Sequence, residues 1–206
     1  MYKNKQILKV NYQTKLEDII KGLKLNGKNP KLLLHCCCGP CSTYVFEYLI
    51  KYFKITAFYY NPNTYPEEEY DLRFKQLEKF SNLSGYNFEI IKSNYRDSEF
   101  YNEINGLENE PEGKKRCEKC INLRLKETAK LAKKLNFDYF TTTLSVSPHK
   151  NADFINKRGN YLQEKYKVNY LFADFKKKDG YKRSIELSNK YELYRQNYCG
   201  CKFSLR

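Results

Sequence analysis

The chain has 206 residues, and 41% of them are apolar, which is enough to fill the core of a single domain. Lys and Arg number 38 against 24 Asp and Glu, so the formal net charge at pH 7 is +14. No apolar run is long enough to cross a bilayer, and residues 1–6 begin with charge and lead into no apolar targeting segment. We therefore expect one domain over residues 1–206 in the cytoplasm, with no membrane partner, and not a secreted disulfide scaffold.

The first 30 residues predict an N-terminal arm and one helix. Thr14-Lys15-Leu16-Glu17 has the form of a capping box, in which Thr14 caps the helix and Glu17 reaches back to it. Apolar residues then recur at helical spacing until Gly27 ends the element. We place this helix outside the catalytic core, which we expect to span residues 31–206.

From residue 31 onward, strand and helix patterns alternate. The expected strands are 31–35, 54–60, 86–92, 137–144 and 168–172. The expected helices begin at Ser42, Pro66, Cys117 and Tyr181, the last one running to Arg195. The helix that begins at Pro66 should turn Leu72, Leu77 and Phe80 toward the core. Strands separated by helices pair in parallel through right-handed crossovers, so we expect a three-layer, Rossmann-like α/β fold of the adenine-nucleotide-hydrolase-like type.

Two loops follow predicted strands at the carboxyl edge of this sheet, which is where α/β folds bind their ligands. One is the loop Cys36–Cys41, and the other is the loop Ser145–Lys150. A nucleotide-binding protein would hold a glycine-rich turn at the first position, because small residues let backbone N–H groups approach phosphate. Thiols occupy that position here, so we interpret the loop as a metal site and not as an ATP site.

The eight cysteines of the chain are confined to three short clusters, which are Cys36, Cys37, Cys38 and Cys41; Cys117 and Cys120; and Cys199 and Cys201. Disulfide frameworks scatter cysteines among distant loops, whereas the ligands of one metal centre arrive in clusters. One interpretation is a zinc site made by Cys38-x-x-Cys41 and Cys117-x-x-Cys120, and the chain would then be a zinc-stabilised tRNA-binding module without redox activity. An iron–sulfur cluster beside a separate dithiol uses more of the cysteines, and we prefer it.

Further motifs stand between and beside the cysteine clusters. In chain order the motifs are His35–Ser42, Asn61-Pro62-Asn63, Glu69-Tyr70 with Arg73, Pro111-Glu112-Gly113 before Arg116-Cys117, Thr141–Leu144, Ser147–Asn151, Asp174–Lys177, Glu186-Leu187-Ser188, Tyr194-Arg195-Gln196 and Tyr198–Ser204. Together they closely resemble the QueH family of epoxyqueuosine reductases, from about Leu32 to Ser204. An ordered set of this kind is far more specific than a single C-x-x-C.

This resemblance implies an oxidoreductase of tRNA processing and queuosine biosynthesis. Members of the family reduce epoxyqueuosine to queuosine at the wobble position of tRNA without cobalamin, and they carry a 4Fe-4S cluster. By position, the resemblance makes the cluster ligands Cys37, Cys38, Cys117 and Cys120. It makes the catalytic pair Cys199 and Cys201, as a redox-active disulfide.

The resemblance also implies a further iron beside the cluster. Cys41 is the first candidate for its ligand, and Asp97 or Asp174 is a weaker one. Cys36 lies where relatives are expected to have a different residue, so we interpret it as a spare thiol.

The chemistry of the residues agrees with these implications. Removing an epoxide oxygen as water takes two electrons and two protons, and the chain has no G-x-G-x-x-G motif that would bind a nicotinamide or flavin cofactor. A dithiol stores two electrons, and Gly200 lets the tight ring between Cys199 and Cys201 close. An external electron donor must then reduce the disulfide again.

Charge and aromatic content together predict an RNA partner. Twenty Tyr and 13 Phe accompany the charge of +14, which suits a polyanion that also offers bases for stacking. The densest basic run should face tRNA phosphates, and it comprises Lys176, Lys177, Lys178, Lys182 and Arg183. Of the two histidines, His149 is the preferred proton donor or phosphate contact, whereas His35 either holds the cysteine loop or transfers protons.

Overall fold

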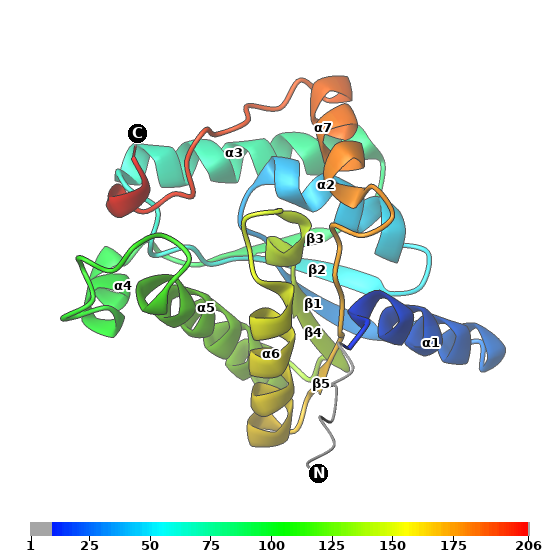
Figure 1. Cartoon of the computed structure of the whole chain (residues 1–206). Helices are drawn as coiled ribbons and strands as arrows, with labels where there is room; N and C mark the ends of the chain where they lie inside the picture. Colours follow the sequence, from blue (N-terminus) through cyan, green and yellow to red (C-terminus); the bar gives the residue numbers. More distant parts are fainter. Residues whose placement is uncertain (1–9, 206) are drawn as a thin grey trace, which may run out of the picture.

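The structure, a computed structural model that describes residues 10–205, is organised around a parallel β-sheet (Figure 1). Its five strands pair in the order β3-β2-β1-β4-β5, and every neighbouring pair is parallel. The strands are β1 (Lys31–His35), β2 (Lys54–Tyr59), β3 (Glu89–Lys92), β4 (Tyr139–Thr142) and β5 (Asn169–Tyr170). The parallel sheet predicted from the sequence is confirmed.

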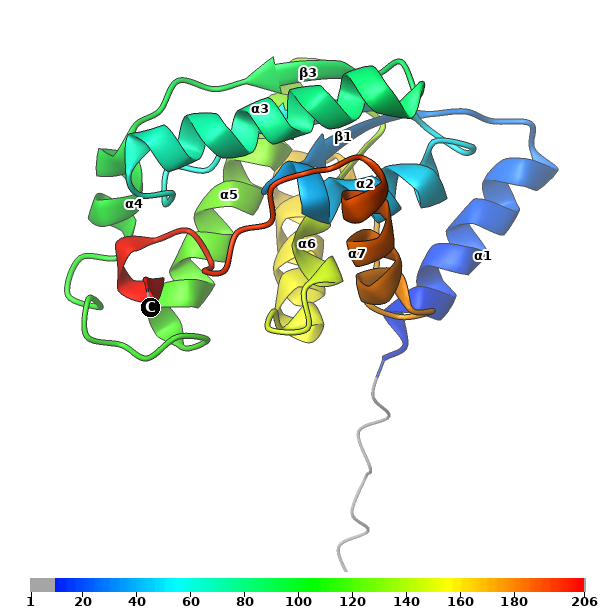
Figure 2. The ribbon, with the colours of Figure 1, turned by 90° about the horizontal axis from the view of Figure 1, so that it is seen from above.

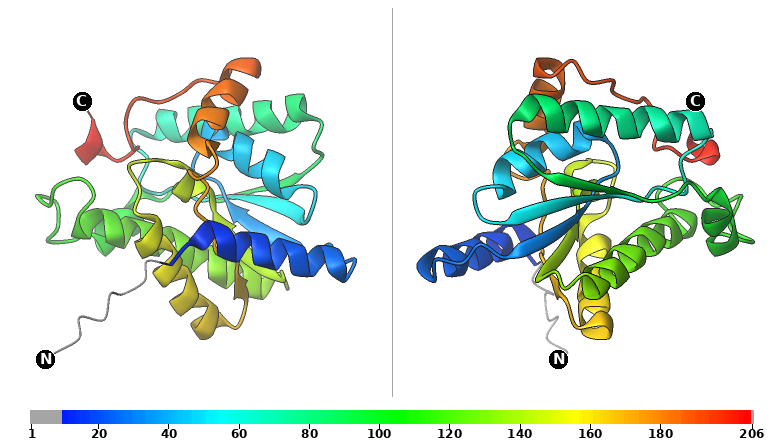
Figure 3. Two further views of the ribbon diagram at one scale, coloured as in Figure 1. Left: turned by 45° about the vertical axis from the view of Figure 1, so that its right-hand side comes forward. Right: turned by 180° about the vertical axis from the view of Figure 1, so that it is seen from behind.

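Helices cover both faces of the sheet. They are α1 (Tyr12–Leu25), α2 (Gly39–Leu49), α3 (Glu67–Ser84), α4 (Asp97–Glu103), α5 (Lys115–Lys134), α6 (Ala152–Tyr166) and α7 (Gly180–Lys190), with 3-10 turns η1 (Thr143–Val146) and η2 (Lys202–Ser204). α2, α3 and α7 lie on one side of the sheet, and α5 and α6 lie on the other (Figures 1 and 3). The predicted three-layer α/β fold is therefore confirmed.

Successive residues of the central strand β1 point to opposite layers. Leu32 and Leu34 pack in the core that includes α1, α2, α3 and α7, whereas Leu33 packs in the core that includes α5 and α6. All three side chains are fully buried. A strand that is covered on both faces reads as a continuous apolar run, which is why residues 31–35 were recognisable in the sequence.

The structure corrects two predictions about helix positions. α1 begins at Tyr12, and its cap is Asn11, whose side chain accepts the N–H groups of residues 13 and 14. Thr14 therefore lies inside the helix, because asparagine is a better cap than threonine and occurs earlier in the chain. On α3, Leu72 is 37% exposed and does not belong to the core face, on which Leu77 and Phe80 are fully buried as predicted.

Other boundaries also differ from the sequence prediction. α4 and α6 have no counterpart among the predicted elements, and α7 ends at Lys190 rather than at Arg195. α6 buries Asn156 and Gly159 beside Ile155 and Leu162, so its core face lacks a clear apolar period. β4 ends at Thr142 and continues as the turn η1.

The segment after α7 carries no long helix or strand and crosses the carboxyl edge of the sheet. Seen from above, it passes α2 and comes back beside α4 and α5 (Figure 2). This path brings the last cysteine cluster close to the first two. Within residues 10–205, no helix is both long and apolar enough to span a membrane. Residues 1–9 of the predicted N-terminal arm, including the charged start at residues 1–6, lie outside the described residues.

Candidate metal and thiol centre

Three thiols gather where β1 ends and α2 begins. The Sγ atoms of Cys37, Cys38 and Cys41 all lie within 4.8 Å of one another, and the Sγ atoms of Cys37 and Cys38 are 3.8 Å apart. α2 begins at Gly39 and not at the predicted cap Ser42, because the thiol of Cys38 accepts the N–H of Cys41 and acts as the cap. The positive end of the α2 dipole therefore points at these thiols, where it favours negative charge.

The three thiols favour a single negative charge. Hydrogen bonds from Cys38 and Cys41 hold the pKa of Cys37 well below its usual value. Burial and the hydrogen bond to Cys37 raise the pKa of Cys38 to about 12, and hydrogen bonds to both neighbours hold the pKa of Cys41 well above its usual value. A soft metal binds thiolates, so metal binding here would release the remaining protons.

A second group of thiols surrounds a smaller cavity beside α5. Cys117 and Cys120 lie one helical turn apart and line this cavity together with Cys199 and Cys201. Burial raises the pKa of Cys120 to about 11. Asn63 also lines the cavity, is 4% exposed, and has an Oδ1 atom without a hydrogen-bond partner among the described residues. Soft thiol donors beside an unpaired buried oxygen form a set that fits a bound metal group.

Two cations, the buried Arg124 and the half-buried Lys150, lie between the two groups of thiols. They line the smaller cavity and also a larger one, whose wall includes thiols of the 36–41 loop. Lys150 Nζ is 3.0 Å from Cys199 Sγ, and Arg124 donates from Nε to the carbonyl oxygen of Cys120 at 3.3 Å. Arg124 is only 3% exposed, and a buried charge requires a partner of opposite sign. The shared space is therefore suited to anionic groups such as thiolates.

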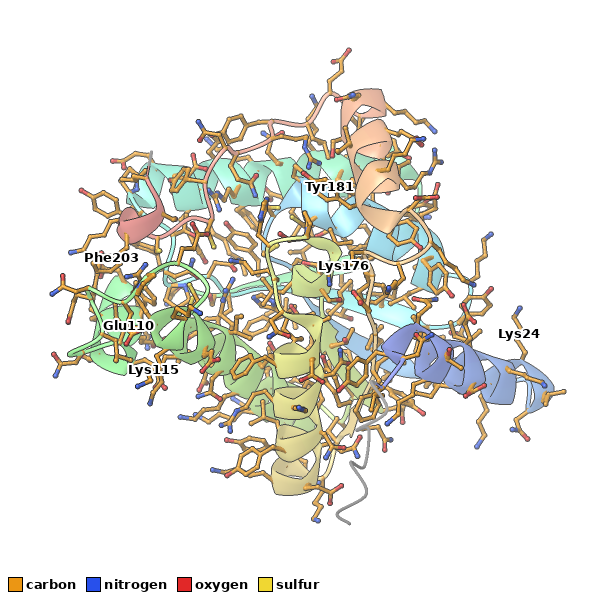
Figure 4. All side chains as sticks on the ribbon, in the orientation of Figure 1. Lys24, Glu110, Lys115, Lys176, Tyr181 and Phe203 are labelled. Atoms are coloured by element: carbon orange, nitrogen blue, oxygen red, sulfur yellow. The ribbon has the colours of Figure 1, made fainter. Side chains whose placement is uncertain are left out.

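The larger cavity has a volume of about 550 Å³ and is framed by the 144–150 loop, the start of α7 and the C-terminal segment. Its wall includes the aromatic side chains of Tyr181 and Tyr198, and Figure 4 shows Tyr181 at the start of α7. Glu112 is the one carboxylate among the described residues that line it. A pocket of this size and lining suits a small organic ligand, with aromatic surfaces for stacking and polar groups for orientation.

Hydrogen bonds around Gly200 hold the C-terminal segment against residues 61–73. The N–H of Tyr65 donates to the carbonyl oxygen of Gly200 at 2.8 Å, and the hydroxyl of Tyr198 donates to the carbonyl oxygen of Tyr65 at 2.5 Å. Gly200 has φ +129°, and a Cβ atom there would lie 2.8 Å from Nη1 of Arg73. Both the backbone conformation and the close approach therefore require glycine between the two last cysteines.

The same segment also contacts the start of α5. The guanidinium of Arg116 lies over the ring of Phe203 at 4.6 Å, and Figure 4 shows Phe203 on the same side of the molecule as Glu110 and Lys115. All eight cysteines are free thiols in the structure. The segment thus holds Cys199 and Cys201 as a dithiol against the wall of the smaller cavity.

His35 holds the cysteine loop in place by hydrogen bonds. Its ring is fully buried, with Nδ1 2.8 Å from Thr142 Oγ1 and Nε2 3.1 Å from the carbonyl oxygen of Tyr60. Burial lowers the pKa of His35 to about 4, so the ring is neutral at pH 7. A neutral ring that donates from Nε2 accepts the threonine hydroxyl at Nδ1. Of the two interpretations of His35, the structure supports the hydrogen-bonding one.

His149 and Cys36 have contrasting environments. His149 is exposed and lines the larger cavity, at the edge where the sequence placed it. Cys36 is fully buried, its Sγ donates to the carbonyl oxygen of Leu34 at 3.4 Å, and burial holds its pKa far above the usual value. Cys36 therefore remains a protonated thiol inside the core.

The predicted basic run is largely paired with carboxylates. Arg183 donates to both Glu47 and Glu186, Lys178 pairs with Glu17, and Lys176 pairs with Asp174. These three cations are therefore paired within the chain, and the contact of the run with tRNA phosphates stays a prediction. Lys177 and Lys182 are exposed and have no ion pair within residues 10–205.

Asp97 and Asp174 are the weaker candidates, after Cys41, for a ligand of the second iron. Asp174 accepts a hydrogen bond from Lys176 at 2.7 Å, and Asp97 is the first residue of α4. Neither belongs to the group formed by Cys37, Cys38 and Cys41.

Sequence reasoning missed Arg124. It follows Cys120 by four residues and Cys117 by seven, and this spacing puts all three side chains on one face of a helix. A cation at that spacing from two predicted metal ligands was the signal that would have identified it.

Comparison with solved structures supports the fold. The U34-tRNA thiolase NcsA from Methanococcus maripaludis, solved with its [4Fe-4S] cluster, superposes with a TM-score of 0.51 and 15% sequence identity. The match covers 94% of this chain and 68% of that one. At this level of identity the similarity concerns the arrangement of strands and helices alone.

Comparison with protein families is more specific. The family model described as epoxyqueuosine reductase QueH matches residues 32–206. The epoxyqueuosine reductase QueH of Staphylococcus epidermidis is 43% identical over 202 residues, covering 95% of this chain and 85% of that protein. The corresponding protein of Streptococcus pyogenes is 39% identical over 202 residues, covering 96% of this chain and 79% of that protein. That of Thermotoga maritima is 38% identical over 178 residues, covering 84% of this chain and 90% of that protein. The chain belongs to the QueH family of epoxyqueuosine reductases.

Proposed function

We propose that this chain removes the epoxide oxygen from epoxyqueuosine at the wobble position of tRNA and leaves queuosine. Family membership gives the reaction class. The observation that carries the proposal for the site is that thiols from three separate parts of the chain line adjoining cavities around Arg124 and Lys150. The larger cavity has room for a base that has left the anticodon stack.

We propose that the cofactor is a 4Fe-4S cluster held by Cys37, Cys38, Cys117 and Cys120. In support, two of these thiols stand at the positive end of α2, and the other two share one face of α5. Cys41 lies within 4.8 Å of Cys37 and Cys38 and is the proposed ligand of an additional iron. Iron in such a site would supply one-electron transfer and a Lewis acid for the epoxide oxygen.

Cys199 and Cys201 are the proposed store of two electrons. Deoxygenation converts an epoxide, two electrons and two protons into an alkene and water, and oxidation of a dithiol to a disulfide yields both the electrons and the protons. Gly200 gives the backbone the freedom to close this ring. An external donor then reduces the disulfide for the next turnover.

The proposed substrate is tRNA, and not the free nucleoside. The net charge of +14 favours a polyanion, and its attraction to phosphates falls as salt is added. The exposed Tyr181 and the half-buried Tyr198 in the wall of the larger cavity offer rings on which a flipped base would stack.

Anaerobic purification, followed by measurement of iron, sulfide, zinc and visible absorption, tests the cofactor. Conversion of tRNA that carries epoxyqueuosine, followed by nucleoside mass spectrometry, tests the reaction. Cys117→Ser should lose the cluster, whereas Cys36→Ala, which alters a core thiol, should keep it. A colourless protein that is loaded with zinc and leaves epoxyqueuosine intact would instead identify a zinc-stabilised tRNA-binding module.

A further inference from the structure

Lys150 lies between the C-terminal dithiol and the larger cavity. Its ammonium lies 3.0 Å from Cys199 Sγ, and its side chain lines both cavities. It follows the turn η1 and immediately precedes Asn151, whose side chain accepts the N–H of Phe154 and caps α6. The lysine is therefore held between two ordered elements at the carboxyl edge of the sheet.

The groups that face Lys150 keep it protonated. Burial lowers its pKa, but the attraction and hydrogen bond of the neighbouring Cys199, together with the attraction of Cys117, outweigh the lowering effects. Arg124 on α5 opposes it as a like charge. The net result is a raised pKa for Lys150, so a proton is available beside a reactive sulfur.

We propose that Lys150 is a catalytic residue that donates a proton to the epoxide oxygen while Cys199 and Cys201 are oxidised. This inference rests on the proposed function, because it requires both the epoxide and the dithiol. Lysine is a known general acid, and this ammonium contacts a sulfur of the dithiol and also borders the cavity proposed for the substrate.

The step balances in atoms, charge and electrons. The proposed step starts from a Cys199 thiolate, a Cys201 thiol and a Lys150 ammonium. Two C–O bonds of the epoxide break and an S–S bond forms, with the two sulfurs giving up two electrons. The oxygen leaves as water with one proton from Lys150 and one from Cys201, while an alkene, a disulfide and a neutral amine remain. Reduction by an external dithiol and uptake of protons then restore the starting state.

The neighbouring cation Arg124 and His149 are less suited to this role. A guanidinium keeps its proton at any pH compatible with folding, so Arg124 stabilises negative charge but does not donate the proton. His149 is exposed at the cavity, and its only hydrogen bond among the described residues runs from its backbone N–H to Ser147 Oγ. Among the lysines of residues 10–205, Lys150 is the one whose Nζ donates a hydrogen bond to a cysteine sulfur.

A single-turnover experiment tests this role. Pre-reduced, cluster-loaded protein is mixed anaerobically with tRNA that carries epoxyqueuosine, and both queuosine and the disulfide are quantified over time, per bound cluster. Lys150→Met should slow both by about 10²- to 10⁴-fold, the usual contribution of a general acid. Lys150→Arg should remain almost as slow, although it keeps the charge. The matched control is Lys130→Met on α5, which removes a lysine paired with Glu127 at 2.7 Å and should leave the rate unchanged.

Chemical rescue separates proton donation from a structural role. Small primary amines should restore turnover to Lys150→Ala, to an extent that depends on the pKa of the amine. A Lys150→Arg variant as fast as the unmodified protein, or Lys150→Ala that no amine rescues, would overturn the role of Lys150 alone. An unmodified, cluster-loaded protein that leaves epoxyqueuosine intact would overturn the proposed function as well.

Discussion

Arg73 on α3 donates a hydrogen bond from Nη1 to the carbonyl oxygen of Cys199, 126 residues further along the chain, at 3.1 Å. Its Nη2 donates to the carbonyl oxygen of Tyr198 at 3.4 Å, and its Nε pairs with Glu69 at 2.7 Å. The guanidinium also lies over the ring of Tyr198 at 4.9 Å. One buried side chain therefore fixes the backbone of the dithiol segment to a helix from the first half of the sequence.

Arg73→Ala should release the C-terminal segment and weaken the fold. Glu69 would be left with a poorly exposed, unpaired charge, and losing one partner of a buried pair costs about 3–5 kcal/mol. Hydrogen exchange should increase in residues 194–201, and urea unfolding should report the loss of stability. Arg183→Ala is the control, because its pairs with Glu47 and Glu186 are largely exposed and contribute at most about 1 kcal/mol. Equal destabilisation by both variants would contradict the role of Arg73.

Gly200→Ala should displace Cys199 and Cys201. The new Cβ would meet Nη1 of Arg73 at 2.8 Å, and φ +129° is strained for alanine by about 1–3 kcal/mol. We expect turnover to fall sharply while iron and sulfide content stay unchanged. Gly85→Ala is the matched control, because it also has a positive φ, +70°, but has no atom within 4 Å of the new Cβ. Normal turnover in Gly200→Ala would show that the geometry of the dithiol is not critical.

Cys201→Ser should keep the cluster and lose turnover. Cys201 is buried at 7% exposure and faces Ser204 Oγ at 3.6 Å, apart from the three thiols at the start of α2. A serine cannot form the disulfide that supplies two electrons. Iron analysis checks that the cluster is kept, and nucleoside mass spectrometry checks that turnover is lost. Loss of iron in Cys201→Ser would instead make Cys201 a metal ligand.

Binding of tRNA should depend more on Lys177 and Lys182 than on Lys178 and Arg183. The first two are exposed and have no ion pair with any residue of the range 10–205, whereas the other two already pair with carboxylates. Each phosphate contact that is lost should flatten the slope of log affinity against log salt by about 0.7–0.9. Lys177→Ala with Lys182→Ala is compared with Lys178→Ala and Arg183→Ala by titration at several salt concentrations. A larger change of slope in the second double variant would refute the ranking.

The sequence predicted the sheet and the edge that carries the site, because β1 is apolar throughout and the cysteine loop follows it directly. It misplaced the start of α2, because a thiol seldom caps a helix, and Cys38 does so here. Arg124 was missed although its spacing places it on the helix face of Cys117 and Cys120, because what that face meets depends on the packing of α5 beside the C-terminal segment. The ion pair of Arg183 with Glu47 depends on the contact between α2 and α7, which no local pattern reveals.

The burial of Cys36 gives this protein an internal probe of its own unfolding. A pulse of alkylating reagent reaches that sulfur only when the core around Leu34 opens, so the yield measures the free energy of opening. The neighbouring thiol of Cys37, which is partly exposed and has a lowered pKa, would react as soon as a bound metal departs. Peptide mapping of one short loop would therefore time cofactor loss and core opening separately, and would reveal which of the two comes first in air.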